Sequence, residues 1–381
     1  MRKSLFVAPL RTPFGRAFKG YLSETRPDDL LVKLLESQKI NNARLFDCKI
    51  DDLICGCAYP EGEQGYNIAR MAALGAGLNL PGLTVNRLCA SSMEAVAIAS
   101  SRVSLKQADI ILVAGVESMS RIKRKGAGYS ESSLIRERSP KAYVNMGETA
   151  EEVATISTIS RLQQEDFAAR SHELADRAYS KEYYSDHVLD IDGVARDEGI
   201  RLPVNREKMA SLSPAFKDDG CVTAATSSPL SDGATSGFIV SEQIAKDLNL
   251  EGLEILDCSW GQVAPEIMGL GPVPAVEKLF KRNRLDPEQI DAYEINEAFA
   301  VQVLACQQEL CLPADRINNW GGAISIGHPL GASGLRLMMT LLGRLRELSK
   351  PGTLGLATLC VGGGQGLAIL CRFVSHLKSQ R

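Results

Sequence analysis

The sequence predicts an α/β fold, because short apolar runs typical of buried strands alternate with longer segments of helical periodicity. This alternation occurs twice, once before and once after a stretch between residues 118 and 250 in which it breaks down. Of the 381 residues, 45% are hydrophobic, which is enough to build the core of one large or two fused domains. The sequence therefore predicts two halves of similar element order joined by an insertion.

Strands are predicted where β-branched and apolar residues run together, and helices where apolar residues recur every three or four positions. Strands are expected at residues 5–8, 52–55, 83–85, 110–114, 253–258, 292–295, 354–359 and 367–373. Helices are expected at residues 28–38, 68–76, 91–102, 276–282, 299–310 and 334–348, and within the insertion at 149–160 and 164–180. We predict a first half at residues 1–117 completed by 220–250, an inserted loop domain at 118–219, and a second half at 251–381.

The overall charge of the chain argues against several classes of function. The formal net charge is −3, so no global field attracts nucleic acid or an anionic membrane. No apolar stretch approaches the ~20 residues that a membrane span needs, and the N-terminus does not have the pattern of a secretory signal. We therefore expect a cytoplasmic protein with no membrane span and no nucleic acid partner.

The chain has ten cysteines, but their spacing does not indicate a metal site. The closest pair, Cys55 and Cys57, has no second pair and no histidines nearby at zinc spacing. Most of the others lie in apolar runs, as buried cysteines do in a reducing compartment. No bound metal is expected.

Cys89 differs from these cysteines in its surroundings. It lies in residues 86–93 (Asn-Arg-Leu-Cys-Ala-Ser-Ser-Met), between an apolar run and an alanine-rich stretch. The thiol is thus expected at a strand-to-helix junction, where free backbone N–H groups and the helix dipole favour a thiolate. Cys89 is therefore a candidate nucleophile, and a packed core cysteine is the alternative interpretation.

Three further segments combine reactive side chains with turning backbone. Residues 296–299 (Asn-Glu-Ala-Phe) follow a predicted strand and open a helix, where an asparagine can also be a simple N-cap. Residues 321–331 form a glycine-rich loop stiffened by a proline, and this loop holds His328. Residues 360–366 (Cys-Val-Gly-Gly-Gly-Gln-Gly) end a predicted strand with a second thiol, Cys360, beside flexible backbone.

Together these groups fit carbon–carbon chemistry on a thioester. A nucleophilic thiol needs a base, and an imidazole suits that role near neutral pH. A second proton carrier, such as Cys360, is needed only if a carbanion or enolate forms. Glycine-rich backbone and a carboxamide can supply donors for two oxyanions. A cysteine hydrolase would need the first thiol and the histidine but not the second thiol.

The four segments, in this order, resemble the signature blocks of the thiolase family. The resemblance extends from residues 11–15 (Arg-Thr-Pro-Phe-Gly) to the last predicted strand. It implies a thiolase fold, in which two βαβαβαββ halves stack into five layers, αβαβα, with a loop domain inserted in the first half. It also implies a homodimer or a homotetramer built as a dimer of dimers.

The resemblance implies a role for each residue of the predicted site. Cys89 would be the nucleophile that carries the acyl group, and His328 would take its proton. Cys360 would protonate the departing acetyl-CoA enolate, or deprotonate acetyl-CoA in the reverse direction. One oxyanion hole would consist of His328 and a water held by Asn296, and the other of the backbone N–H groups of Cys89 and Gly362.

The resemblance also implies coenzyme A as a co-substrate, with no permanently bound cofactor. Phe299 and Met268 resemble walls of the acyl and pantetheine pocket, and Ser228 resembles a serine that contacts pantetheine. Arg201 lies where a cation meets the nucleotide end of CoA, whose phosphates need local positive charge on this chain. Further candidate cations are Arg206, Lys208 and the cluster Arg121, Lys123, Arg124 and Lys125, although a charge run is more often a solvated surface.

Two positions depart from the family pattern. Asn145 stands where acetoacetyl-specific members usually have histidine, and Trp320 stands where an asparagine usually precedes Gly-Gly. Residues 63–70 (Glu-Gln-Gly-Tyr-Asn-Ile-Ala-Arg) resemble degradative bacterial 3-ketoacyl-CoA thiolases, which partner a multifunctional fatty-acid oxidation subunit. The preferred function is therefore cleavage of 3-ketoacyl-CoA by CoA to acetyl-CoA and a shortened acyl-CoA.

Three alternatives stay open. A biosynthetic acetyl-CoA C-acetyltransferase would use the same residues to condense two acetyl-CoA into acetoacetyl-CoA. A carrier-protein-dependent fatty-acid condensing enzyme would share the fold, but it needs a His–His or His–Asn pair facing the cysteine. A non-enzymatic partner subunit would not require Cys89, His328 and Cys360 to be intact.

Overall fold

The computed structural model describes residues 2–123, 126–348 and 350–375, so Arg124 and Lys125 of the predicted basic cluster and residues 376–381 of the predicted second half lie outside it. The described strands form one sheet in the order β4-β3-β5-β6-β1-β7-β10-β9-β8, with β2 paired to β6. The strands are β1 (Ser4–Arg11), β2 (Gly15–Arg16), β3 (Asp52–Gly56), β4 (Gly82–Val85), β5 (Ile110–Ser118), β6 (Ser231–Ser241), β7 (Glu251–Gln262), β8 (Ala292–Ile295), β9 (Leu354–Val361) and β10 (Gln365–Ser375).

The two ends of this sheet repeat one arrangement. In the first half, β3 runs parallel to β4 and β5, and β6 runs antiparallel to β5 and β1. In the second half, β8 runs parallel to β9, and β10 runs antiparallel to β9 and β7. A parallel bridge between Tyr293 and Ile317 lies where the counterpart of β4 is expected. The halves join where β1 pairs with β7 along residues 5–7, so the chain builds the same topology twice.

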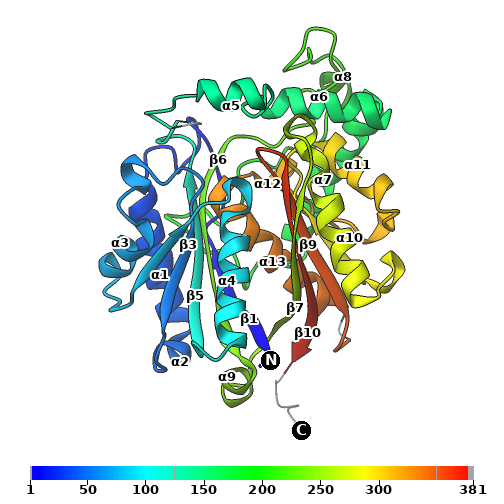
Figure 1. The fold of residues 1–381 in the computed structure, drawn as a ribbon. Helices are drawn as coiled ribbons and strands as arrows, with labels where there is room; N and C mark the ends of the chain where they lie inside the picture. Colours follow the sequence, from blue (N-terminus) through cyan, green and yellow to red (C-terminus); the bar gives the residue numbers. More distant parts are fainter. Residues whose placement is uncertain (1, 124–125, 349, 376–381) are drawn as a thin grey trace.

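The two halves of the sheet and three layers of helices form five layers in all (Figure 1). One outer layer, α1 (Pro27–Asn41) and α3 (Ile68–Gly75), covers the first half, and the other, α10 (Pro272–Asn283) and α11 (Ala300–Glu309), covers the second. Between the two halves lie α4 (Ser91–Ser104) and α13 (Leu330–Glu347). Each helical layer buries its own apolar cluster against the strands. The layer order is αβαβα, as the resemblance implies.

The central layer brings the two halves into close contact. Helix α13 is buried along most of its length, because apolar side chains occupy both the face toward β5 and the face toward β9. A Cβ added to Gly334 would lie 2.4 Å from the backbone nitrogen of Met93 in α4. Glycine therefore lets α4 and α13 approach backbone to backbone.

The insertion lies over one end of the layers (Figure 1). Its helix α6 packs against α11, and α7 packs against α11 and α12. The boundaries predicted for the inserted domain and the two halves stay a prediction. The remaining helices are α2 (Ala43–Phe46), α5 (Ser133–Arg138), α6 (Met146–Ser157), α7 (Arg161–Ser180), α8 (Arg206–Ala210), α9 (Glu242–Asp247) and α12 (Ala323–Ile326).

Strand β6 is absent from the predicted strands, because its first seven residues are small or polar. The whole strand is nevertheless buried between β1 and β5. Small residues are required here, since a Cβ on Gly237 would lie 2.5 Å from the ring of Phe6, and one on Gly233 would lie 2.3 Å from the ring of Phe14. A buried strand of small residues has no apolar run from which it could be recognised.

Trp320 packs in an aromatic cluster separate from the apolar cluster that holds Met268 and Phe299. Its side chain is 3% exposed, and it stacks on Tyr183 with ring centroids 4.8 Å apart. Its Nε1 donates to Oε2 of Glu347 at 2.9 Å. Trp320 therefore fixes the insertion to the end of α13 and does not line the predicted acyl pocket.

In the described part of the chain, no helix combines the length and the apolar character that crossing a bilayer requires.

Candidate active site

Cys89 lies in a short 3-10 turn, Leu88–Ala90, between β4 and α4. Leu88 has a positive φ of 45°, a backbone conformation that a leucine adopts only at a cost in energy. The Oγ of Ser91 fixes the turn, because it accepts from the backbone N–H of Arg87 at 3.0 Å and donates to the carbonyl of Leu88 at 2.6 Å. The turn contacts β9 and α13. The half-buried thiol of Cys89 thus lies at the junction of the two halves.

Cys360 reaches the same junction from the end of β9, and its side chain is 1% exposed. Burial raises the pKa of the Cys360 thiol well above its usual range, and the nearby Cys89 and Cys306 raise it further. The turn that holds Cys89 contacts β9, the strand that carries Cys360. Gly362 lies in the following turn, where an added Cβ would be 3.0 Å from Cδ1 of Leu88. The cysteine turn and the glycine turn are therefore in contact.

A glutamine side chain holds these two turns together. Oε1 of Gln365 accepts from Nη1 of Arg87 at 3.2 Å, and its Nε2 donates to the carbonyl of Gly362 at 3.2 Å. The first contact reaches the segment before Cys89, and the second reaches the turn after Cys360. Gln365 was not singled out from the sequence, although it lies within the predicted glycine segment.

The hydrogen bonds of His328 define its tautomer. Its Nδ1 lies 2.5 Å from Oγ of Ser333, and this hydroxyl donates its one hydrogen to the carbonyl of Pro329 at 2.8 Å. Ser333 can therefore only accept from His328, so the ring hydrogen is on Nδ1. Nε2 then carries the lone pair, which is the form needed to take a proton from a thiol.

Asn296 faces this lone pair. Its Nδ2 lies 3.3 Å from Nε2 of His328, and its Oδ1 accepts from Nη2 of Arg336 at 2.9 Å. Its backbone N–H donates to the carbonyl of Thr358, two residues before Cys360. Asn296 is not the N-cap of the following helix, because Phe299 occupies that position. The carboxamide is therefore available to the site.

Buried carboxylates hold the surrounding loops. Glu297 accepts from Oγ of Ser171 at 2.6 Å and from the backbone N–H of Ile324 at 3.2 Å. Glu117, at the end of β5, accepts from the backbone N–H of Gly331 at 2.8 Å. Burial raises the pKa of both carboxyl groups, and these donors oppose the rise. Both residues therefore fix the ends of the histidine loop.

An apolar cluster beside Cys360 contains two of the predicted pocket residues, Met268 and Phe299. Phe216 packs edge-on against Phe299, with ring centroids 5.9 Å apart. The backbone N–H of Ser228 donates to the carbonyl of Ala298 at 3.0 Å, which places this serine next to the cluster. Asn145, the second departure, caps α6 by accepting from the backbone N–H of Gly147 at 3.1 Å.

Arg201 lies apart from these groups, at a cavity of about 300 Å³ lined by Arg16, Lys208, Ser227 and Pro229. The cavity is continuous along the chain with Ser228, since it includes the residues on either side. Three cations line it. Partial burial lowers the pKa of Arg201, and the positive charge of Arg16 lowers it further. An anion would relieve this repulsion.

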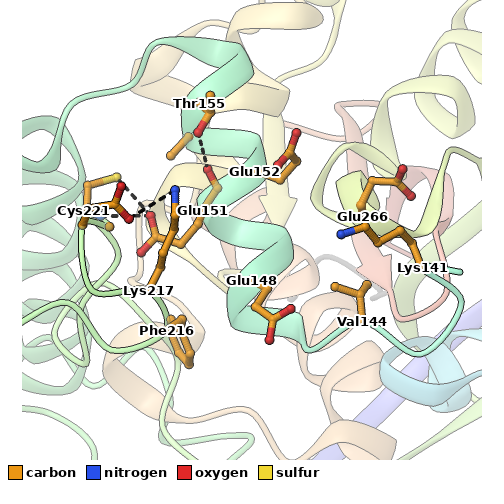
Figure 2. Close-up of a pocket in the computed structure, with 13 residues that line it drawn as sticks. Lys141, Val144, Glu148, Glu151, Glu152, Thr155, Phe216, Lys217, Cys221 and Glu266 are labelled. Carbon is orange, nitrogen blue, oxygen red and sulfur yellow. Dashed lines mark hydrogen bonds and ion pairs between the residues drawn. The ribbon is translucent and has the colours of Figure 1, made fainter.

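A second cavity, of about 500 Å³, lies beside α6 and is lined by Phe216 together with several carboxylates and lysines (Figure 2). One of these carboxylates, Glu151, is engaged with the backbone N–H groups of Cys221 and Val222, both at 2.9 Å. None of the predicted site residues lines this cavity. Its carboxylates make it a poor site for the phosphates of CoA.

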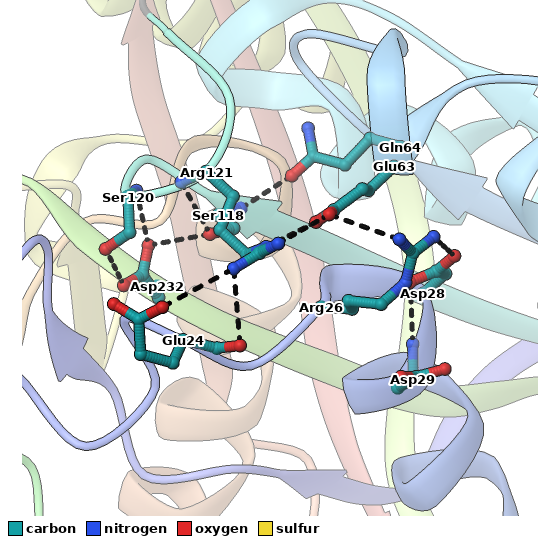
Figure 3. A network of polar contacts seen from close by, with 10 residues as sticks. All are labelled: Glu24, Arg26, Asp28, Asp29, Glu63, Gln64, Ser118, Ser120, Arg121 and Asp232. Carbon is teal, nitrogen blue, oxygen red and sulfur yellow. Dashed lines mark hydrogen bonds and ion pairs between the residues drawn. The ribbon is translucent and has the colours of Figure 1, made fainter.

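The described part of the predicted basic cluster includes Arg121, which is held in an acidic network (Figure 3). Nη2 of Arg121 donates to Oε1 of Glu63 at 2.6 Å, and Nη1 of Arg26 donates to the same oxygen at 3.2 Å. Glu24 contributes its backbone carbonyl to Arg121 at 3.3 Å. The charge of Arg121 is therefore largely balanced within the fold.

Two family models cover nearly all of the chain. Residues 4–243 match the model described as Thiolase, N-terminal domain, and residues 252–373 match Thiolase, C-terminal domain. The chain belongs to the thiolase family. This thiolase-family chain is 40% identical to a 3-ketoacyl-CoA thiolase of Cronobacter sakazakii and 36% identical to one of Bacillus subtilis, in both cases over 97% of this chain and 98% of the relative.

Solved structures of thiolase relatives agree with the fold. Human mitochondrial 3-ketoacyl-CoA thiolase in complex with CoA matches with a TM-score of 0.88 at 32% identity, over 98% of both chains. Bacillus anthracis acetyl-CoA acetyltransferase matches with a TM-score of 0.88 at 33% identity, over 98% of this chain and 99% of that chain. The predicted family and the predicted thiolase fold are confirmed.

Sequence reasoning missed the residues that orient the others in this thiolase site. Ser333 and Arg336 follow His328 by five and eight positions, within the first two turns of α13. One signal for Arg336 was available, because an arginine inside the apolar run of residues 335–339 is unusual unless it is paired. The tautomer-setting contact of Ser333 had no such signal.

Proposed function

We propose that this thiolase cleaves 3-ketoacyl-CoA with CoA, releasing acetyl-CoA and a shortened acyl-CoA. The observation that carries the proposal is that the turn of Cys89 contacts the strand of Cys360 and the turn after it, while Asn296 faces His328. The names of the curated relatives support the same reaction. The second thiol distinguishes this site from that of a cysteine hydrolase, which protonates no carbanion.

The proposed reaction begins with transfer of the Cys89 proton to Nε2 of His328, and the sulfur bonds to C3 of the substrate. The C2–C3 bond then breaks, and its electron pair leaves on the acetyl-CoA enolate while C3 becomes a thioester carbon on Cys89. Cys360 gives its proton to C2, which completes acetyl-CoA. The thiol of CoA returns a proton to Cys360 and attacks the thioester, and Cys89 recovers its own proton from His328.

Two negative oxygens form in this sequence, and different donors are proposed for each. The oxygen on C3 lies next to Cys89 while it is bonded to the sulfur, so the backbone N–H groups of Cys89 and Gly362 would receive it. The enolate oxygen would lie between Nε2–H of His328 and a water held by Asn296. The contact between these two side chains at 3.3 Å supports their joint role.

The burial of Cys360 supports its role as a proton donor. Because burial raises the pKa of this thiol, Cys360 stays protonated across neutral pH. An enolate carbon requires a protonated donor at the moment it forms. Loss of this donor by ionisation would occur only at alkaline pH, above the usual range for a cysteine.

CoA is proposed to enter past Ser228, with its phosphates at the cavity lined by Arg16, Arg201 and Lys208. Replacing Arg201 with alanine is expected to raise KM for CoA by about fivefold and to leave kcat nearly unchanged, because the phosphates do not react. The increase should shrink at high ionic strength. Steady-state thiolysis at two salt concentrations measures both effects.

Arg206 offers a control for this experiment, because its guanidinium is paired with Asp166 outside the cavity. Its replacement with alanine removes the same charge from the same segment and is expected to change KM by less than about twofold. Equal effects of the two substitutions would mean that the cavity does not receive the phosphates.

The substrate proposal is tested by thiolysis of short, medium and long 3-ketoacyl-CoAs. Values of kcat/KM that rise beyond the four-carbon substrate are expected, because an apolar pocket gains binding energy with each buried methylene. The biosynthetic alternative, condensation of two acetyl-CoA, predicts activity confined to acetoacetyl-CoA. The histidine of acetoacetyl-specific members is replaced here by Asn145, which favours the first outcome.

Several expectations, drawn from the resemblance or from the sequence alone, stay predictions. These are assembly as a homodimer or homotetramer, association with a multifunctional fatty-acid oxidation subunit, and a cytoplasmic location. Copurification followed by mass measurement tests the first two directly.

A further inference from the structure

Arg336 is a buried cation that the proposed reaction does not use directly. It lies on α13, and its side chain is 1% exposed. Burial lowers the pKa of its guanidinium, which reflects the cost of removing the charge from water. Such a residue needs compensating contacts if its purpose is to stabilise the fold.

Those contacts are few. Among the described residues, Nε and Nη1 of Arg336 have no hydrogen-bond partner. Nη1 lies 3.7 Å from Oε2 of Glu294, which is beyond hydrogen-bond distance. The one hydrogen bond of this guanidinium runs from Nη2 to Oδ1 of Asn296, at 2.9 Å. The buried charge is therefore directed at the carboxamide of the site.

Arg344, about two turns further along α13, provides the contrast. Its Nη1 donates to Oε1 of Glu294 and to the carbonyl of Tyr293, both at 2.7 Å, and its Nη2 donates to the carbonyl of Arg316 at 2.8 Å. Oε1 of Glu294 is thus hydrogen-bonded by Arg344, whereas Oε2 has only the longer ion pair with Arg336 at 3.7 Å. Arg344 has the contacts of a structural arginine, and Arg336 does not.

We propose that Arg336 is a positioning residue that fixes which end of the Asn296 carboxamide faces the reaction. The proposal rests on the thiolase reaction proposed above. A guanidinium only donates, so it holds Oδ1 of Asn296 on its own side and turns Nδ2 toward Nε2 of His328.

The orientation matters at each stage of the reaction. In the free enzyme, Nδ2–H meets the lone pair on Nε2, and a flipped amide would place two lone pairs 3.3 Å apart. Once His328 holds the proton, a flipped amide would place its acceptor oxygen beside Nε2–H and draw this donor away from the enolate oxygen. Arg336 prevents the flip without touching the substrate.

The test compares Arg336→Met with Arg344→Met. The first is expected to lower kcat for thiolysis by about thirtyfold, which is less than the loss of a whole oxyanion donor, with KM for CoA within about twofold of the wild type. Arg344→Met is expected to lower the midpoint of thermal unfolding by about 3 °C or more, because it removes the hydrogen-bond donor of Oε1 of the buried Glu294 and of the carbonyl of Arg316, while kcat of the folded enzyme is kept.

A double-mutant cycle with Asn296→Ala separates positioning from a general structural effect. In the Asn296→Ala background, Arg336→Met should lower kcat by less than about twofold, because no carboxamide remains to be oriented. A thirtyfold loss in both backgrounds would overturn the proposal, as would unchanged kcat in the single variant. If Arg336→Met does not fold, Arg336→Leu, which likewise donates no hydrogen bond to Asn296, replaces it in the same cycle.

Failure of this inference is distinguishable from failure of the proposed function. An Arg336→Met enzyme with wild-type kcat still performs thiolysis, so only the positioning role is lost. If the wild-type enzyme shows no thiolysis, the proposed function itself is refuted.

Discussion

Replacement of Cys89 with serine is expected to lower kcat for thiolysis by at least about a thousandfold, or about 4 kcal/mol in the activation barrier. The turn Leu88–Ala90 would present a hydroxyl in place of the thiol, and an imidazole cannot deprotonate a hydroxyl as readily. Steady-state thiolysis measures the loss. Mass spectrometry of the enzyme mixed with 3-ketoacyl-CoA should show an acyl adduct on the wild type and none on the variant.

The exposed Cys311 provides the matched control, because its thiol lies on the surface, where it donates to the carbonyl of Gln308. Cys311→Ser makes the same change of sulfur to oxygen and is expected to leave kcat and the adduct unchanged. Normal thiolysis by the Cys89→Ser variant would refute the route through an acyl-Cys89 intermediate, even though the chain has the thiolase fold.

Replacement of Cys360 with alanine is expected to separate the two halves of the reaction. Carbon–carbon cleavage should fall by about a hundredfold to ten-thousandfold, the range attributed to a general acid, because no donor remains for the enolate. Exchange of an acyl group between acyl-CoA and labelled CoA forms no enolate, and His328 alone can pass the Cys89 proton to the leaving CoA and take it back. Exchange should therefore persist within about threefold. The two rates, measured on one preparation, report the two steps.

The pH dependence of cleavage follows from the raised pKa of Cys360. The thiol is the active form, so cleavage that depends on it is retained below the pKa and lost above it. Since burial raises that pKa, the wild-type enzyme should keep this contribution through neutral and mildly alkaline pH. An ordinary cysteine begins to ionise near pH ~8. A cleavage rate that already declines with rising pH below that value would contradict the assignment.

Cys306 is the control for Cys360, because it is a buried neighbour whose Sγ contacts the carbonyl of Gly269 at 3.3 Å. Cys306→Ala removes a thiol of similar burial and should lower stability without changing the ratio of cleavage to exchange. If Cys360→Ala lowers both rates equally, its role is structural and another group protonates the enolate.

The elements that the apolar pattern predicts are mostly those the fold contains. The strands at 292–295 and the helices around 68–76 and 91–102 have the expected positions within a few residues. Strand β6 was missed, because small residues bury it where neighbouring rings leave no room for a side chain. The local sequence pattern shows only which structure a segment prefers. The need for small residues in β6 comes from the rings of Phe6 and Phe14, which are distant in sequence.

In the candidate site, too, the sequence predicted some residues and missed others. Cys89, His328 and Cys360 were predicted as reactive because each lies in turning backbone with a chemistry of its own. Ser333 and Arg336 were not, since a serine or an arginine on a helix has no reactivity that marks it. Their importance lies in the atoms they touch on His328 and Asn296.

The amino-acid order by itself determined the α/β class, the doubled element order and the identity of the thiol, imidazole and amide groups, because these depend on residue type and spacing along the chain. The tertiary structure alone decided that the turn of Cys89 meets the turn after Cys360, that Nε2 of His328 carries the lone pair, and that Trp320 packs against α13. The physical reason is that hydrogen-bond direction and contact between distant segments are set only once the two halves close on the central helices.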